Sequence, residues 1–488
     1  MEMNRRAWIK TIGASLLAIS QSATGQDRFT GKGSRHPREQ GTFKTEVPVH
    51  ALDVILARPT DRSVTVSVLG YQDMEGTIEY GTKPGEYSHW IPTARWQAGR
   101  PQEILLESLQ PNTRYYYRVR YRPAGENAFR TAGPYTFHTA RPPGKSFVFT
   151  VQADSHLDEP TSSAIYLQTL HSALASRPDF HIDLGDTFMT DKYGRNFHGS
   201  ADQYLAQRYY FGQLSHSSPL MLTLGNHDGE AGWLNNESVD NIAVWSNRMR
   251  TSYFPNPVPD RFFTGNTNEI AGIGLPQNYY AWHWGDALFV VLDPFWPTQR
   301  KTRPGGDGWN WTLGRQQYDW LETTLRTSDT KYKFIFIHHL VGGSGESARG
   351  GAEAAHLFEW GGCDLDGQYV FESQRPSWPV PIHELLRKYH VSAVFHGHDH
   401  GFAQQELNGI IYQLVPQPGF SRMGSTRPLE MYGYENGTIL AGSGYLRIRV
   451  SQESATVDYI RAKIQGIGIV GQATQENAFS YKIPADNS

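Results

Sequence analysis

The chain has 488 residues, more than one ordinary domain holds, so two or three domains are expected. Its 45 Lys and Arg residues nearly balance 48 Asp and Glu residues, and the formal net charge of -3 excludes a global electrostatic field that attracts nucleic acid or an anionic membrane. Cys363 is the single cysteine, so the chain has no intramolecular disulfide and no thiolate cluster that binds a metal.

Residues 1–25 have the pattern of a signal peptide. Arg5 and Arg6 precede an apolar run at 11–19, and small residues follow as far as Gly25. The apolar run is too short to span a bilayer. The arginine pair resembles the twin-arginine export signal of bacteria, and a general secretion signal with an incidental arginine pair is the alternative. We therefore expect a periplasmic or extracellular protein that has no membrane anchor once the signal is removed.

Residues 26–46 are polar and contain several glycines, which is typical of a linker. Residues 47–141 then alternate short strand-like runs with Pro and Gly clusters, at intervals that favour an all-β sandwich. Pro142 and Pro143 mark the end of this domain, because consecutive prolines cannot join a central strand. We expect no catalytic residue in it. The predicted strands are 63–68, 76–80, 102–106 and 115–120.

From residue 145 onward, apolar strand-like runs alternate with helical patterns, which indicates an α/β arrangement. Residues 279–293 predict a hairpin that turns at Gly285-Asp286. Apolar residues at helical spacing predict helices around Leu170, Leu321 and Leu385. Long insertions follow the sheet edges that should face the site, so they are expected to decide which substrate enters. These insertions are 188–216, 229–277, 296–313 and 341–379.

Five apolar runs end in side chains that bind metals. Because open α/β sheets build their sites beyond the carboxyl ends of strands, we expect these side chains to meet at one edge. Hard oxygen ligands together with imidazoles suit Mn, Fe or Zn rather than Ca. The five sequences are Asp154-Ser155-His156, Gly185-Asp186, Gly225-Asn226-His227-Asp228, His338-His339 and Gly397-His398-Asp399-His400.

The order Asp-x-His, Gly-Asp, Gly-Asn-His-Asp, His and Gly-His-x-His resembles the calcineurin-like metallophosphoesterase superfamily. All five of its motifs occur between Asp154 and His400. The resemblance covers residues 145–465 and implies a β-sandwich flanked by helices, followed by a C-terminal tail at 466–488. Upstream, the run from Leu109 to Val119 resembles the fibronectin type III-like N-terminal domain of purple acid phosphatases. The resemblances together imply two β-sandwich domains, of which the second is catalytic.

The superfamily resemblance implies a centre of two divalent or mixed-valence transition metal ions, Fe, Mn or Zn. A hydroxide shared by the two metals is the nucleophile that the resemblance implies, and a phosphate ester is the substrate. Carried over motif by motif, the first metal has the ligands Asp154, His156 and His400, the second has Asn226, His338 and His398, and Asp186 bridges the two.

The resemblance assigns His227 as the general acid or a phosphate-positioning residue, because the family's equivalent histidine sits by the leaving group. Asp228 is expected to orient this imidazole, and a role as a loop cap is the alternative. His339 is either a neighbour of the metal ligands or simply the next loop residue. The other histidines of this region lack a motif and are expected to be structural or at the surface: His181, His283, His356, His383, His390 and His396.

The chain departs from the purple acid phosphatases at one ligand. Their iron-binding tyrosine follows the bridging aspartate in a Gly-Asp-x-x-Tyr pattern, but Met189 occupies that position here. His156 supplies a nitrogen ligand instead. We therefore expect no tyrosinate-to-iron colour, and a pH optimum nearer to neutral.

The leading functional prediction is a binuclear phosphomonoesterase or phosphodiesterase that acts on a small-molecule phosphate ester. A non-catalytic binding or scaffold protein with a degenerate phosphoesterase domain is the alternative. Degeneration usually removes ligands first, and none of the motif ligands is missing. No nucleic-acid partner is indicated, and the oligomeric state is left open.

Overall fold

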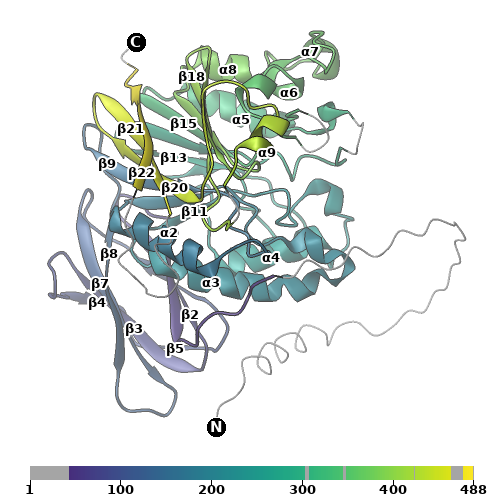
Figure 1. The fold of residues 1–488 in the computed structure, drawn as a ribbon. Helices are drawn as coiled ribbons and strands as arrows, with labels where there is room; N and C mark the ends of the chain where they lie inside the picture. Colours follow the sequence, from purple (N-terminus) through teal and green to yellow (C-terminus); the bar gives the residue numbers. More distant parts are fainter. Residues whose placement is uncertain (1–42, 303–306, 345–347, 422–423, 463–475, 487–488) are drawn as a thin grey trace, which may run out of the picture.

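The structure is a computed structural model that describes residues 43–302, 307–344, 348–421, 424–462 and 476–486 (Figure 1). The predicted signal peptide and most of the predicted linker lie outside the described residues. Within the described part, no helix is both long enough and apolar enough to cross a membrane.

An N-terminal β-sandwich comes first, drawn in purple and blue in Figure 1. One sheet has the order β1-β2-β6; the other has the order β4-β3-β7-β8, with β5 also paired to β3. Burial alternates along β7, so Tyr117 and Val119 point into the core while Arg118 and Arg120 point outward. The four predicted strands are confirmed. The strands are β1 Leu52–Ala57, β2 Val64–Gly70, β3 Met74–Gly81, β4 His89–Trp90, β5 Ala94–Trp96, β6 Gln102–Leu106, β7 Arg114–Pro123 and β8 Arg130–His138.

Two further sheets form the second domain. The six-stranded sheet has the order β11-β10-β9-β20-β21-β22, and the eight-stranded sheet has the order β12-β13-β14-β15-β16-β18-β17-β19. The strands of the first are β9 Phe147–Gln152, β10 Phe180–Asp183, β11 Leu220–Leu222, β20 Gly444–Val450, β21 Ser454–Arg461 and β22 Glu476–Pro484. The strands of the second are β12 Thr264–Gly265, β13 Tyr280–Trp284, β14 Ala287–Val291, β15 Tyr332–Ile337, β16 Ala393–His396, β17 Phe402–Leu407, β18 Ile410–Leu414 and β19 Thr438–Leu440.

The core between these two sheets is rich in aromatic residues. Phe149 of β9 packs edge-on against Phe289 of β14, with ring centroids 5.1 Å apart, and Phe336 stacks on Phe395 at 5.1 Å. Helices cover the outer faces: α2 and α3 pack near Tyr445 on the six-stranded sheet, while α5 and α8 cover the eight-stranded one. The predicted β-sandwich flanked by helices is confirmed, as are the three helices and the hairpin of β13 and β14.

The helices vary in length, and the short ones lie mostly in the insertions. The α-helices are α2 Ser163–Ala175, α3 Ala201–Ser215, α4 Ile242–Tyr253, α5 Gly314–Arg326, α6 Phe358–Gly361, α7 Phe371–Gln374, α8 Ile382–Lys388 and α9 Arg427–Met431. The 3-10 helices are η1 Thr190–Ser200, η2 Gly232–Leu234, η3 Gly308–Asn310 and η4 Ala352–Ala354.

The predicted C-terminal tail is wrong for its described part. Residues 476–484 form β22, an edge strand paired antiparallel with β21 along its length. Ile483 is buried in the core between the sheets, and the Tyr481 hydroxyl donates a hydrogen bond to Gln413 at 2.7 Å. The sheet of the catalytic domain therefore extends to Pro484 instead of ending near residue 465.

The insertion after β10 joins the two domains. Its helix α3 packs on the outer face of the β1-β2-β6 sheet, where Ile55 and Leu69 contact Phe211 and Phe254. Arg208 of α3 is fully buried there. It donates hydrogen bonds to the hydroxyl and carbonyl of Ser67, both at 3.0 Å, and to the carbonyls of Tyr253 at 2.6 Å and Asp53 at 3.4 Å.

Candidate metal centre

The predicted ligands lie where five strands end. β9, β10 and β11 run parallel in one sheet, and β15 and β16 run parallel in the other, so their carboxyl ends meet at one edge of the sandwich. The residues after these strands turn sharply into the site. Asp154, Asp186, His398 and His400 all have positive φ, between 54° and 74°. This conformation costs non-glycine residues about 1 kcal/mol or more each, and such strain concentrates at functional sites.

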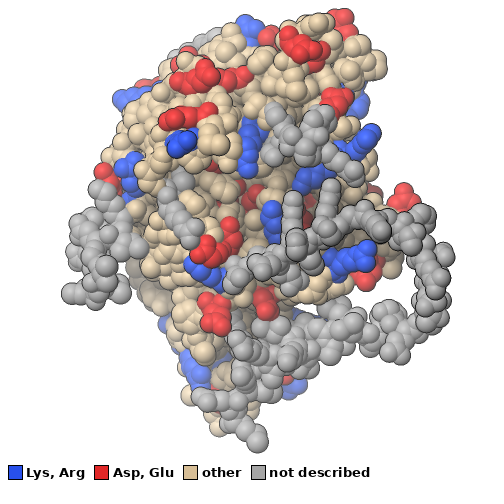
Figure 2. Space-filling view, turned by 45° about the vertical axis from the view of Figure 1, so that its right-hand side comes forward, with Lys and Arg blue, Asp and Glu red and all other residues tan. Residues whose placement is uncertain are grey.

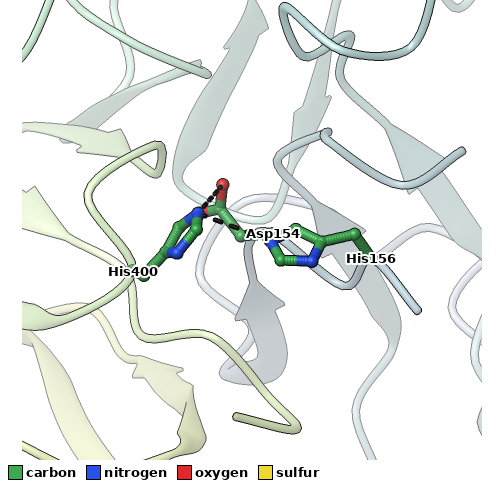
Figure 3. A group of neighbouring side chains, drawn as sticks. All are labelled: Asp154, His156 and His400. Atoms are coloured by element: carbon green, nitrogen blue, oxygen red, sulfur yellow. Dashed lines mark hydrogen bonds and ion pairs between the residues drawn. The ribbon is translucent and has the colours of Figure 1, made fainter. Parts of the chain in front are cut away.

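Asp154, His156 and His400 form a first group whose ligand atoms all lie within 4.8 Å of one another. Figure 3 shows the Asp154 carboxylate between the two imidazoles. Nε2 of His400 lies 3.4 Å from Oδ1 of Asp154 and 3.4 Å from Nε2 of His156. On its other side the His156 ring has Oδ1 of Asp158 3.1 Å from its Nδ1. This carboxylate holds the ring with Nε2 toward the site.

Asp186, His338 and His398 form a second group of the same kind. Nε2 of His338 lies 3.3 Å from Oδ2 of Asp186, 3.2 Å from Nδ1 of His398 and 3.1 Å from Oδ1 of Asn226. Nδ1 of His338 donates to the carbonyl of Leu184 at 2.8 Å, which leaves the Nε2 lone pair directed into the site.

The two groups are neighbours. Nε2 of His338 lies 4.0 Å from Oδ1 of Asp154, and the amide of His398 donates to Oδ2 of Asp154 at 2.9 Å. Oδ1 of Asp186 accepts the amide of His227 at 2.7 Å. All seven predicted ligand residues thus come together at one edge of the sandwich, and their binding of metal remains a prediction.

The electrostatics of the two groups favour added positive charge. Burial raises the pKa of Asp186, but the nearby imidazoles of His338 and His227 outweigh burial and hold it well below its usual range. Burial lowers the pKa of His338, yet the carboxylates of Asp186 and Asp154 raise it to about 10. Burial and the neighbouring His338 hold the pKa of His398 well below its usual range. The low pKa of Asp186 means that this carboxylate is ionised, and an ionised buried carboxylate favours a cation beside it.

The residues fit transition metal ions. The N–N and N–O separations of 3.1 to 3.4 Å within each group match the edges of a coordination shell built from bonds of about 2.0 to 2.2 Å. Oδ1 of Asp154 is buried and has no hydrogen-bond donor among the described residues. Imidazole nitrogens, carboxylates and an amide oxygen form a donor set suited to Fe, Mn or Zn.

The predicted pairing of Asp228 with His227 is wrong. The buried Asp228 carboxylate accepts the backbone amides of Asp186, Thr187, Phe188 and Gly225 at 2.7 to 3.1 Å. It therefore caps the loop after β10, the alternative role considered for it, and holds Asp186 in place. The turn of the backbone at Gly225-Asn226 directs Asp228 and His227 to different sides, although they are neighbours in sequence.

Asp191 is the partner of His227 instead. Its two carboxylate oxygens lie 2.9 and 3.0 Å from Nδ1 of His227, which donates to them. Asp191 comes from η1, in the insertion after β10, where no periodic pattern indicated a functional residue. The His227 side chain is 21% exposed. Its Nε2 is thus available on the open side of the site.

His339 is not among the grouped ligand atoms. Its Nδ1 donates to the carbonyl of Leu340 at 2.8 Å, and its ring packs edge-on against Trp311 and Phe295. Burial and the nearby His338 lower its pKa to about 3. In the described part of the chain, the six histidines without a motif also lie outside the two ligand groups.

Two further residues near the proposed ligands were not predicted from the sequence. Nε2 of Gln417, in the loop after β18, lies 3.3 Å from Nε2 of His156. Arg349 donates to Oδ1 of Asp399 at 2.7 Å and to the carbonyl of His398 at 3.2 Å, and it stacks on the ring of Tyr432. Arg349 thereby supports the loop that carries two of the predicted ligands. Neither residue belongs to one of the five motifs, so no pattern in the sequence indicated them.

Comparison with known proteins shows that the chain matches a known protein family. The profile of the calcineurin-like phosphoesterases matches residues 147–402, which span all five motifs and more than half of the chain. The chain belongs to the calcineurin-like phosphoesterase family. It is accordingly a phosphoester hydrolase, and the family implies divalent metal ions at the site. No curated protein sequence matches the chain.

Two solved structures have the same fold as this phosphoesterase. The structure of PhoD is similar with a TM-score of 0.62 at 15% identity, over 93% of this chain and 92% of that one. The purple acid phosphatase PPD1 from yellow lupin (Lupinus luteus) seeds is similar with a TM-score of 0.58 at 16% identity, over 90% of this chain and 75% of that one. Both likenesses extend across the N-terminal sandwich as well as the catalytic domain, and at these identities they establish the fold.

Proposed function

We propose that this phosphoesterase is a binuclear metal enzyme that hydrolyses small phosphate monoesters or diesters. One metal would be held by Asp154, His156 and His400, the other by Asn226, His338 and His398, with Asp186 between them. The observation that carries the proposal is the adjacency of two complete ligand groups, joined through His338 and the carboxylates of Asp154 and Asp186.

When bound, two cations would supply water activation, binding of the phosphate oxygens and neutralisation of charge in the transition state. Residues of the chain itself donate the proton to the leaving group and hold the catalytic groups in position. Nε2 of His227 donates a proton to the leaving group, and the Asp191 carboxylate fixes the tautomer and orientation of that imidazole. Asp228 holds the loop at 186–188, so that the Asp186 carboxylate does not shift during turnover.

The direction of substrate entry follows from burial. Asp154, Asp186 and His338 are almost inaccessible, whereas the side chains of His400 and His227 are 35% and 21% exposed. The site therefore opens on the side of these two histidines, and the substrate approaches there. On the face drawn in Figure 2, acidic and basic side chains are interspersed, so this face has no surface of one charge that would attract or repel an anionic ester.

Asp186→Asn tests the proposal directly. Metal content and the rates on p-nitrophenyl phosphate and bis-p-nitrophenyl phosphate are measured for wild type, for this variant and for Asp319→Asn. Asp319 is an exposed residue of α5, bound only by Arg315 in the described structure. Asp186→Asn should lose metal and at least about 100-fold in rate, while Asp319→Asn retains both. Unchanged metal content and turnover in Asp186→Asn contradict the proposal, and the ratio of the two rates assigns the ester class.

We also propose export through the twin-arginine signal, and a colourless enzyme with an optimum near neutral pH. Replacing Arg5 and Arg6 by lysines should retain the protein in the cytoplasm. Export of the Lys-Lys variant at the wild-type level contradicts the twin-arginine assignment. A purple protein as purified contradicts the proposal that the site has no tyrosinate ligand.

A further inference from the structure

A cavity lies far from the metal centre, where the two domains meet. Its volume is about 440 Å³, and it opens at the amino-terminal ends of β9 and β10 beside the turn between β20 and β21. Because β9 spans six residues before the loop that carries Asp154, the cavity and the metal centre are on the order of 20 Å apart. The cavity thus has no part in the site described above.

The lining of this cavity is strongly basic. It contains Arg114 of the N-terminal sandwich together with Arg141, Arg177 and Arg449, and Asp179 is its single acidic residue. Arg141 donates to both carboxylate oxygens of Asp179, and the indole N–H of Trp284 donates to the same carboxylate at 3.0 Å. The Asp179 carboxylate is therefore already paired with Arg141, and it does not neutralise the other three guanidinium groups that line the cavity.

Two of these arginines have no partner in the part of the chain that the structure describes. The side chains of Arg114 and Arg177 make no hydrogen bond or ion pair there, whereas the Arg449 guanidinium lies 3.1 Å from the carboxylate of Asp458, which it shares with Arg447. Arg177 follows the end of α2 with φ 51°, a position that glycine usually takes. Arg177 therefore has a long cationic side chain at a position where the backbone conformation favours glycine.

We propose that this cavity binds a small phosphate-bearing anion at a site separate from the catalytic centre. Guanidinium groups bind phosphate oxygens through paired, charge-assisted hydrogen bonds, and Arg114 and Arg177 have all their side-chain donors available. Hydroxyls of Ser146 and Ser454 add further donors at the rim. The volume suits a small molecule rather than a lone phosphate ion. Bound there, the anion links the N-terminal sandwich to the catalytic sheet.

Calorimetric titration of the metal-loaded enzyme tests the proposal with three probes that the enzyme does not hydrolyse. Methylenediphosphonate represents inorganic diphosphate, phenylphosphonate represents an organic phosphate, and inorganic phosphate is the third probe. Inhibition of p-nitrophenyl phosphate hydrolysis reports binding at the catalytic centre, and the remaining heat reports the cavity. Metal content after each titration identifies any loss of metal to the diphosphonate.

The test variant is Arg114→Ala/Arg177→Ala, which removes two side chains that hold no other described residue in place. The control is Arg95→Ala, an arginine of the same sandwich whose side chain is 91% exposed. The double variant should weaken the non-inhibitory binding at least about tenfold and leave inhibition and turnover unchanged, and the control should retain both. The probe that binds best then distinguishes an inorganic from an organic source of the phosphate group.

Wild-type protein that shows only the inhibitory binding overturns the proposal. So does a double variant that keeps non-inhibitory binding at wild-type strength. If the protein has no phosphoesterase activity, the loss of bound probe in the double variant is still measured by heat alone, so a failure of the proposed function is distinguished from a failure of the cavity proposal.

Discussion

The Asp191 carboxylate lies 2.9 Å from Nδ1 of His227, and this contact joins a residue of the insertion after β10 to the motif after β11. A carboxylate in this position fixes the tautomer and the orientation of the imidazole. The amide of His227 is at the same time bound to Oδ1 of Asp186 at 2.7 Å. His227, the proposed acid, is therefore held by two contacts: Asp191 binds its ring, and the proposed metal ligand Asp186 binds its backbone amide.

Asp191→Asn should slow hydrolysis in a way that depends on the leaving group. An alkyl phosphate needs a proton on its leaving oxygen, so its kcat should fall about 10- to 100-fold, whereas p-nitrophenyl phosphate should lose less. The pH profile of kcat for each substrate completes the measurement. Asp240→Asn is the matched control, because Asp240 pairs with the exposed His198 at 3.2 Å. An equal loss on both substrates refutes the assignment of His227 as the acid.

The sequence was sufficient to predict which residues meet at this edge of the sandwich, because each proposed ligand lies within a few residues of the end of a buried strand and the sheets bring those ends together; their binding of metal stays a prediction. Asp191 could not be found in this way, since its position depends on the path of a non-periodic 3-10 segment. Asp228 was misassigned for a related reason. Adjacency in sequence placed it beside His227, but a tight turn points its carboxylate at the amides of residues 186–188.

The fold was predicted with one clear error at its C-terminal end. Strand β22 is separated from β21 by the segment 462–475, and it pairs at the edge of a sheet whose pattern looked complete without it. Its residues alternate between exposed and partly buried, with Ile483 as the one fully buried member. An edge strand of this kind carries too few core residues to stand out as apolar periodicity.

Gly225→Ala should disable the site without replacing any proposed ligand. A Cβ at position 225 would lie 2.0 Å from the amide nitrogen of Asp186 and 2.3 Å from its Oδ1. The carboxylate must therefore move, and a displacement of about 1 Å at a catalytic group costs on the order of 100-fold in rate. Metal content and kcat are compared with those of Gly424→Ala, where a Cβ meets nothing within 4 Å. Wild-type activity in Gly225→Ala would show that Asp186 tolerates displacement.

Arg208→Met should destabilise the junction between the domains. The substitution leaves the carbonyls of Ser67, Asp53 and Tyr253 without their buried donor, which costs about 3 kcal/mol in the free energy of unfolding. Urea unfolding measures the loss, and Arg95→Met, at a side chain that is 91% exposed, is the control. Equal stability of the two variants would mean that water replaces the guanidinium at the junction.

His181→Gln should reduce the decrease in the free energy of unfolding that wild type shows as the pH falls. His181 of β10 is fully buried, its Nδ1 lies 2.8 Å from the Thr150 hydroxyl, and burial lowers its pKa to about 3. In the unfolded chain its pKa is about 6.5, so below that pH the unfolded state binds a proton that the folded state does not. The contribution of His181 to the free energy of unfolding is then fully present above about pH 6.5, and it falls by up to about 1.4 kcal/mol per pH unit as the pH drops toward 3.

Glutamine at position 181 can keep the contact with Thr150 but takes up no proton. Urea unfolding between about pH 7 and pH 5 should therefore give a shallower slope for His181→Gln than for wild type or for the exposed His356→Gln, and identical slopes would exclude His181 as a source of acid sensitivity.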